Sequence, residues 1–269
     1  MGANPLPTLA HLVYGPQDLS PALPDDGYAL VLAVYHATNE GMPSAAVYVS
    51  ARVAGKYVDI YGGRLAGAIQ IVAVDVDGGG VYSRNGERGK PVPLPLAMNP
   101  NPQPTIKGVA PVESAEVYFA VDLVSHLGLP PQGGSYSVFL WLDEMASQPR
   151  LVELQGERAN LTAKPPWPTL LKREVAPGTP GGSPELKLEG SRILGSASGM
   201  FSLLGLDFRS RQVKWVSTSG AAAVECFSFD PGSVFSGPGW LDAPGPPRRA
   251  FLTLCAGGQR STVVTFEVA

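Results

Sequence analysis

Short apolar runs that end at proline or glycine recur along the whole chain. Within residues 46–53, apolar side chains at the odd positions alternate with Tyr48, Ser50 and Arg52. A period of two places successive side chains on opposite faces of a β-strand. Proline and glycine are tolerated in turns and disfavoured inside helices and central strands. The pattern therefore predicts an all-β protein built from antiparallel strands.

The strands predicted in the first part of the chain cover 28–37, 46–53, 56–61, 68–75, 116–124, 135–142 and 150–154, with one helical turn over 123–127. The first of these runs is apolar nearly throughout, as in a strand covered on both faces. The run 135–142 is also apolar on both faces, which indicates a central strand. Together with Tyr136 and the strand that follows, it is similar to the last hairpin of immunoglobulin-like sandwiches. This short match assigns no family.

Two proline-rich segments interrupt the series of strands. Six prolines between residues 91 and 104 predict an extended strap across the surface. Six more between 165 and 184, with three glycines, mark a linker. We therefore expect a larger domain over 1–165, which begins with an extended N-terminal arm and carries the strap. The linker follows at 166–183 and a smaller domain at 184–269.

The smaller domain contains six predicted strands, at 185–194, 199–208, 213–218, 221–229, 249–256 and 261–268. The glycine- and serine-rich residues 195–199 are predicted to form a turn between the first two. This number of strands fits one compact sandwich. The predicted fold class is therefore two antiparallel β-sandwich domains, immunoglobulin-like or jelly-roll-like, joined by a linker rich in proline and glycine.

Charge and hydrophobicity narrow the classes of partner. The net charge of −3 argues against a general nucleic-acid binder. The longest continuous apolar run, 28–35, is far shorter than the roughly 20 residues of a membrane-spanning helix, so no membrane span is expected. No signal peptide is recognised in this chain. The sequence leaves the compartment open, including whether a leader peptide was removed.

No complete catalytic or cofactor motif is found. Residues 195–199 have glycine at both ends like a nucleophile elbow, but Ala197 stands where the serine is required. Phosphate-binding and dinucleotide-binding glycine motifs are absent. We therefore assign no catalytic residue and no cofactor. A glycoside hydrolase is still an alternative, because that chemistry needs two carboxyl groups about 5–10 Å apart. Its candidate carboxylates include Asp122, Asp143 and Glu144.

Metal-binding candidates are weak. His11, His36 and His126 are isolated and lack ligand-like spacing, so no metal site is assigned, and His36 is interpreted as a residue at a strand edge. Asp75 and Asp77 precede three glycines and form a weak calcium candidate. A plain turn is the preferred interpretation, because aspartate in turns accepts backbone hydrogen bonds.

Cys226 and Cys255 both lie in apolar, strand-like runs. A disulfide between them would stabilise the domain by about 3–4 kcal/mol. The alternative is two buried free thiols. The sequence does not decide between these two states.

The tryptophans divide into two pairs. Trp141 and Trp215 lie in predicted strands and are expected in the core. Trp240 lies in a loop rich in proline and glycine, and Trp167 lies in the linker. Exposed loop aromatics stack on sugar rings or anchor partner proteins. Trp240 and Trp167 are therefore the candidate contacts for a partner or a sugar.

These observations favour a non-enzymatic structural or interaction protein, either an assembly subunit or an adhesive surface module, that acts through its loops and sheet surfaces. The expected partner is another protein or a second copy of the chain. A carbohydrate-binding module that uses loop aromatics is the main alternative. A carbohydrate-active hydrolase with paired carboxylates is a less favoured one.

Overall fold

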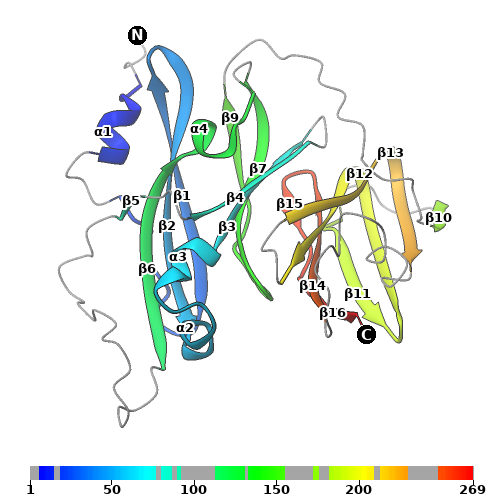
Figure 1. Cartoon of the computed structure of the whole chain (residues 1–269). Helices are drawn as coiled ribbons and strands as arrows, with labels where there is room; N and C mark the ends of the chain where they lie inside the picture. The colour runs from blue at the N-terminus through cyan, green and yellow to red at the C-terminus, as the bar shows by residue number, and fades with distance from the viewer. Residues whose placement is uncertain are drawn as a thin grey trace.

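The computed structural model describes residues 6–14, 19–76, 80–86, 90–91, 113–130, 133–154, 172–175, 182–208, 213–229 and 248–268. Trp167, Trp240 and Asp77 lie outside the described residues, as does the predicted strap apart from Pro91. The described residues form strands in three antiparallel sheets and a few short helices. Figure 1 shows the three sheets one beside another along the molecule.

Sheet A and sheet B come from the first part of the chain. Sheet A has the order β1-β2-β6-β5, with β1 (Ala29–Asn39), β2 (Met42–Ala54), β6 (Ser114–Asp122) and β5 (Lys90–Pro91). Sheet B has the order β4-β3-β7-β8, with β9 also paired to β7; its strands are β3 (Gln70–Asp75), β4 (Val81–Asn85), β7 (Gly134–Leu142), β8 (Met145–Ala146) and β9 (Arg150–Leu154). The predicted central strand is confirmed, because β7 pairs with β3 on one side and with β8 and β9 on the other.

The main core lies between sheets A and B. The odd-numbered residues of β2 from Ala45 to Val53 are fully buried in it. They meet Ile71 of β3 and Leu140 of β7 from the facing sheet. The alternation visible in the sequence therefore places one side of each strand in a shared apolar layer, as in a β-sandwich.

Sheet C contains the described strands that follow residue 171. These are β10 (Lys172–Val175), β11 (Glu185–Glu189), β12 (Arg192–Asp207), β13 (Val213–Phe229), β14 (Arg248–Ala256), β15 (Gln259–Arg260) and β16 (Val264–Val268). The sheet encloses its own apolar core, to which both ends of the long strand β12 contribute, through Ile193 and Leu203. Strand β11 also contacts β14 and β16, so the two halves of the sheet face each other across this core.

The predicted turn at 195–199 is wrong, because these residues lie inside β12. The pairing of β12 with β13 shifts between Ser198 and Gly199, and Gly199 has φ +74°. Such a β-bulge bends a strand without ending it, and glycine adopts this positive φ at little cost. The glycines therefore mark a bend rather than a break. The two strands predicted at 213–218 and 221–229 are likewise one strand, β13.

Sheet B packs its outer face against sheet C. Val72, Val74, Phe139 and Trp141 of sheet B form a continuous cluster with Leu204, Leu206, Phe251 and Cys255 of sheet C. Each of these side chains is at most 5% exposed. At one end of the cluster, Arg260 donates hydrogen bonds to the carbonyl oxygens of Ala146 (3.0 Å) and Ser147 (3.2 Å). The described sheets therefore form a continuous stack.

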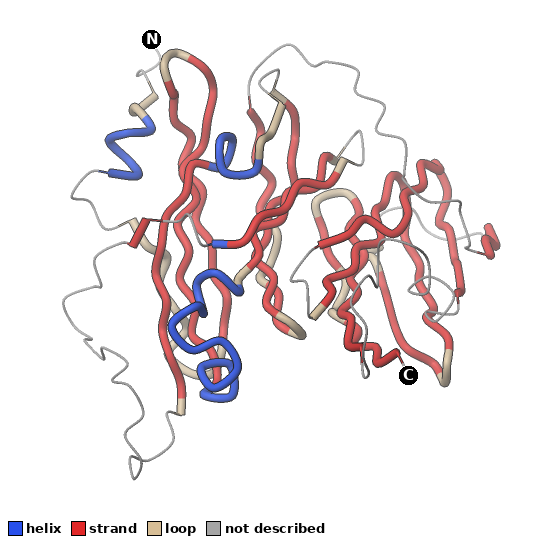
Figure 2. The backbone as a smooth tube through the Cα atoms, viewed as in Figure 1, coloured by secondary structure: helices blue, strands red, loops and turns tan. Residues whose placement is uncertain are grey.

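Short helices lie around sheets A and B (Figure 2). They are α1 (Leu9–Tyr14), α2 (Gly55–Tyr61), η1 (Gly62–Arg64), α3 (Leu65–Ala68) and α4 (Leu123–Leu127). The helical turn predicted at 123–127 is confirmed as α4. The strand predicted at 56–61 is wrong, because these residues form α2 across the end of the sandwich. Helical spacing brings Tyr57 and Tyr61 together, with parallel rings 6.4 Å apart.

The N-terminal arm covers the outer face of sheet A. Its described parts are residues 6–14, which include α1, and residues 19–27. Leu9 and Leu12 of α1 are buried against Tyr48 and small side chains of this face. In Figure 1, α1 lies on the side of sheet A that faces away from sheet B. Strand β1 is therefore covered on both faces, as predicted, although it is an edge strand.

The fold prediction is confirmed: the described chain is all-β, antiparallel and built from sandwiched sheets. Within the predicted linker, Lys172–Val175 forms β10 and pairs with β13. These four residues lie between Pro168 and Pro177 and contain neither proline nor glycine, so they are free to join the sheet. None of the helices among the described residues is long and apolar enough to cross a membrane.

Candidate interaction sites

The outer edge of β1 carries backbone groups that do not pair with β2. Thr38 lies opposite Pro43. The N–H of Thr38 points away from β2 and donates to the carbonyl oxygen of Pro7 at 3.0 Å. Backbone polar groups alternate in direction along a strand. The other even-numbered residues of β1, including Val34 and His36, therefore also direct their N–H and C=O groups to this edge.

Among the described residues, the strand pairing at this edge is limited to the bridge of Thr8 to Thr38. Strand β1 also contacts β7, β8 and β9 of the facing sheet. His36, near the end of β1, is exposed. Unpaired strand edges are ready templates for pairing with another chain.

A hollow of about 440 Å³ lies where the edges of sheets A and B diverge. We call it the seam hollow. Its described lining comes from β1, the β1–β2 hairpin, β9 and the arm: Leu6, His36, Ala37, Thr38, Gly41, Pro43, Ser44, Glu153 and Leu154. Leu6 is 49% exposed, and Met42, beside the lining residues Gly41 and Pro43, is 51% exposed. The seam hollow therefore combines a free strand edge with accessible apolar side chains.

One wall of the seam hollow is fixed by side-chain hydrogen bonds. Ser44 donates to the carboxylate of Asp122 at 2.6 Å. The same carboxylate oxygen accepts the backbone N–H of Val124 at 3.1 Å and so caps helix α4. An aspartate in this position satisfies a helix donor that would otherwise be unpaired. Asp122 therefore has a structural role beside the hollow.

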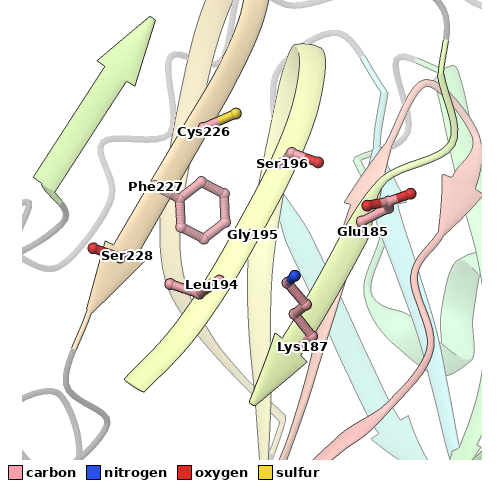
Figure 3. A pocket seen from close by; sticks show the side chains of 8 residues that line it. All are labelled: Glu185, Lys187, Leu194, Gly195, Ser196, Cys226, Phe227 and Ser228. Atoms are coloured by element: carbon pink, nitrogen blue, oxygen red, sulfur yellow. The ribbon is translucent and has the colours of Figure 1, made fainter. Parts of the chain in front are cut away.

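A second hollow, of about 400 Å³, lies on sheet C, and we call it the β12 hollow. Figure 3 shows its lining, which consists of Glu185, Lys187, Leu194, Gly195, Ser196, Cys226, Phe227 and Ser228. Glu185 and Lys187 are exposed on β11 and give the hollow one charge of each sign. Arg192 donates to the hydroxyl of Ser228 at 2.9 Å. The lining offers polar contacts from several strands.

Two carboxylates considered for hydrolysis are engaged by neighbouring side chains. Asp143 is 2% exposed and accepts hydrogen bonds from the hydroxyl of Tyr61 at 2.9 and 2.7 Å to its two oxygens. Glu144 forms an ion pair with Lys56 at 2.5 Å. Burial and the adjacent Glu144 raise the pKa of Tyr57. These contacts join helix α2 to the β7–β8 turn, so the carboxylates hold the end of the sandwich together.

The three histidines lie on separate elements, His11 in α1, His36 in β1 and His126 in α4. No group of three metal-ligating side chains comes together among the residues that the structure describes. Asp75 ends β3, and its N–H donates to the carbonyl oxygen of Gly80 at 2.7 Å across the turn. The calcium candidate that pairs it with Asp77 stays a prediction.

The two cysteines are free thiols, and the disulfide considered from the sequence is not formed. Cys226 pairs with Ser196 on one side of β12, and Cys255 pairs with Ser202 on its other side. A strand rises about 3.3 Å per residue, so the two positions are roughly 20 Å apart along β12. A disulfide needs Cα atoms within about 7 Å. Cys255 is buried in the contact between sheets B and C, whereas Cys226 is half-buried.

Trp141 lies in the core as expected, fully buried, and donates to the carbonyl oxygen of Asp143 at 2.8 Å. The side chain of Trp215 and the contact candidates Trp167 and Trp240 lie outside the described residues, so these stay predictions. The seam hollow could not be found from the sequence, because its lining comes from β1, the β1–β2 hairpin, β9 and the arm, which are far apart along the chain.

The chain has only weak similarity to known proteins. No protein-family model and no curated protein matches the chain. Among solved structures, the chain is similar to the BSP domain of a biofilm-associated protein, at 9% identity and a TM-score of 0.19, over 82% of this chain and 27% of that one. It is also similar to a two-domain fibronectin type-III segment of chicken tenascin, at 10% identity and a TM-score of 0.18, over 90% of this chain and 99% of the other. The chain thus spans about a quarter of the first structure, and TM-scores this low carry no argument about function.

Proposed function

We propose that this chain is a non-enzymatic interaction module that binds an extended segment of a partner protein at the seam hollow. The observation that carries the proposal is the free edge of β1 beside that hollow. Extended peptides bind such edges by adding a strand, with main-chain hydrogen bonds for affinity and pockets for specificity. Val34 and His36 supply the outward N–H and C=O groups, and the hollow accepts side chains.

The arm of the chain illustrates this mode of binding. The outward N–H of Thr38 donates to the carbonyl oxygen of Pro7, and Thr8 forms a parallel bridge with Thr38. A partner segment would continue the same type of pairing toward His36 and Val34. Leu6 and Leu154 line the hollow and would contact apolar side chains of that segment.

The carboxylate contacts support a role without catalysis. Asp122 caps α4, Asp143 accepts from Tyr61, and Glu144 pairs with Lys56. Each has a structural partner. In this proposal the chain has two domains joined by the linker 166–183, and the first domain carries the edge that binds the partner.

A library of random peptides displayed on phage tests the proposal, with the purified chain as the target. Peptides with alternating apolar residues should be enriched. Their binding should be lost in His36→Pro, which removes the outward N–H, and retained in His36→Ala, which keeps it. Proline is tolerated here because this N–H makes no bond to β2. Equal binding to both variants, or no enriched peptide, would contradict the proposal. Binding of a glycan that is lost in Trp240→Ala would support a carbohydrate-binding module instead.

A further inference from the structure

The outer face of sheet A is a surface that holds an extended chain. This face consists of Ala33, Tyr35, Ala37, Ala46, Tyr48 and Ala120. Its alanines keep it shallow, and its two tyrosines stand edge to face with ring centroids 5.7 Å apart. In the structure the arm of the same chain occupies it.

The arm is held mainly through its backbone. Tyr48 donates to the carbonyl oxygen of Leu12. Tyr35 donates to the carbonyl oxygen of Leu19 at 3.2 Å. In both contacts the side-chain donor belongs to sheet A and the acceptor is a main-chain oxygen of the arm.

Arg52 holds the later part of the arm in the same way. Its Nη1 donates to the carbonyl oxygens of Pro24 (2.7 Å) and Asp25 (3.2 Å). Its Nε and Nη2 contact Glu116 of the neighbouring strand, each at 2.8 Å. Glu116 therefore orients the guanidinium before any arm arrives. The donors of this face are fixed by the sheet and do not depend on the arm.

The arm itself depends on the face. Helix α1 has six residues, far fewer than the roughly 12–15 that a helix needs for marginal stability alone. Its two buried leucines, Leu9 and Leu12, have no other core to enter among the described residues. The arm joins β1 through Gly27, which has φ +84° and no atom near the position of a Cβ. This glycine is a suitable hinge because it adopts conformations closed to other residues.

We propose that two copies of this chain associate by exchanging their arms, so that the described arm residues, 6–14 and 19–27, of each copy occupy the outer face of sheet A of the other. A second copy is the partner that fits best, because its arm reproduces every contact already made within one chain. The exchange needs a change at the Gly27 hinge and leaves the hydrogen bonds of Tyr35, Tyr48 and Arg52 intact. Exchange of an identical element between protomers is a low-cost route to a dimer.

This inference goes beyond the proposed function, because it specifies the partner and rests mainly on the outer face of sheet A, although Leu6 and Thr8 of the arm also reach the seam hollow. Failure of arm exchange would leave binding at the seam hollow untouched. Conversely, loss of peptide binding in His36→Pro would leave the arm contacts of Tyr35, Tyr48 and Arg52 in place.

Cysteine cross-linking between two versions of the full chain tests the exchange. One version carries Thr8→Cys and the other, of different size, carries Thr38→Cys; both carry Cys226→Ser, since that native thiol is half-buried. Thr8 and Thr38 are bridge partners, so a disulfide between them reports a seated arm. The two versions are mixed at high concentration, oxidised with oxidised glutathione and separated by size under denaturing, non-reducing conditions.

Arm exchange predicts a covalent heterodimer joined through residues 8 and 38. Pairing the Thr8→Cys version with Glu189→Cys, an exposed position on β11, should give at least about ten times less product. A synthetic peptide of residues 6–27 should reduce the heterodimer several-fold, and a scrambled peptide should not. Leu12→Asp on the Thr8→Cys version should reduce it as well.

A version with both Thr8→Cys and Thr38→Cys shows whether the geometry permits the bond. It should form an internal disulfide at low concentration. If this internal bond forms completely while the heterodimer stays at the level of the Glu189→Cys control, the arm remains on its own chain and the proposal is wrong.

Discussion

The ring of Phe227 lies directly over Gly195 of the neighbouring strand, so that a Cβ at residue 195 would overlap the far edge of the ring. Phe227 is 4% exposed and also stacks on Phe201, at 5.4 Å between ring centroids. A Cβ at residue 195 would therefore force the ring out of its stack on Phe201. A glycine has no side chain to cover its own backbone in a strand, and an aromatic ring on the neighbouring strand can cover it instead.

Gly195→Ala should lower the free energy of unfolding by about 1–3 kcal/mol, the usual cost of overpacking a core. Gly63→Ala is the matched control, since nothing lies within 4 Å of its added Cβ and it should change stability by less than about 0.5 kcal/mol. Combining Gly195→Ala with Phe227→Leu should recover part of the loss. Denaturant unfolding of the four proteins measures each value, and equal stabilities of the two alanine variants would contradict the steric explanation.

Arg260→Ala should lower the free energy of unfolding by about 1–3 kcal/mol, because the carbonyl oxygens of Ala146 and Ser147 lose a charged donor. Arg260→Lys should restore little, since one ammonium cannot reproduce the planar fork of donors. Arg192→Ala, which removes an exposed hydrogen bond to Ser228, is the control and should cost less than about 0.5 kcal/mol. Full recovery by lysine would show that charge alone matters.

The stability of the chain should fall at alkaline pH because of Cys255. Burial raises the pKa of its thiol to about 12, against about 8.5 in an unfolded chain. The folded state therefore holds this proton more tightly, and its stabilising effect is complete below the unfolded pKa and decreases as the pH rises toward 12. Between about pH 8 and about pH 10 the expected loss is about 1–2 kcal/mol.

Cys255→Ala removes the titrating group and should flatten this part of the pH profile, whatever its effect on absolute stability. Denaturant unfolding at several pH values measures both profiles. Cys226→Ala, which removes the other thiol, is the matched control. An identical slope with and without the Cys255 thiol would show that another group causes the decrease.

Tyr61→Phe should destabilise the fold by about 1.5–3 kcal/mol, because the buried carboxylate of Asp143 loses both hydrogen bonds from the phenol. Asp143→Asn is the partner substitution, since asparagine tolerates the positive φ of 51° at this position. The double variant should be clearly less destabilised than the sum of the two single changes. Strict additivity in this double-mutant cycle would show that the two side chains do not act together.

Much of the fold could be predicted because it depends on local pattern. The alternation in β2 and the two apolar faces of β7 follow from a period of two, and helix α4 ends at Gly128 in the left-handed conformation. The segment 56–61 could not be predicted in the same way. Its alternating residues fit a strand, but β2 is already paired on both sides, with β1 and β6. The chain therefore crosses the end of the sandwich as a helix.

The candidate sites were harder to predict because they depend on residues far apart in sequence. Glu153 and Leu154 line the seam hollow with His36 only after sheets A and B have packed together. The contact between Trp141 and sheet C likewise needs both sheets in place. The run of glycine and serine at 195–199 is ambiguous locally, since the same residues suit a turn and a bulge. Pairing with β13 along the run, and with β11 at Gly195 and Ser196, keeps it in the sheet.

The two facing layers of sheet C are made from the same two long strands, β12 and β13, which bend from one layer into the other at Gly199. In an ordinary sandwich the layers are joined by loops, and a sideways pull is resisted by side-chain contacts. Here the main chain itself crosses between the layers twice. A force that shears one layer over the other is therefore carried by covalent bonds, and the layers of sheet C can come apart only if β12 and β13 straighten.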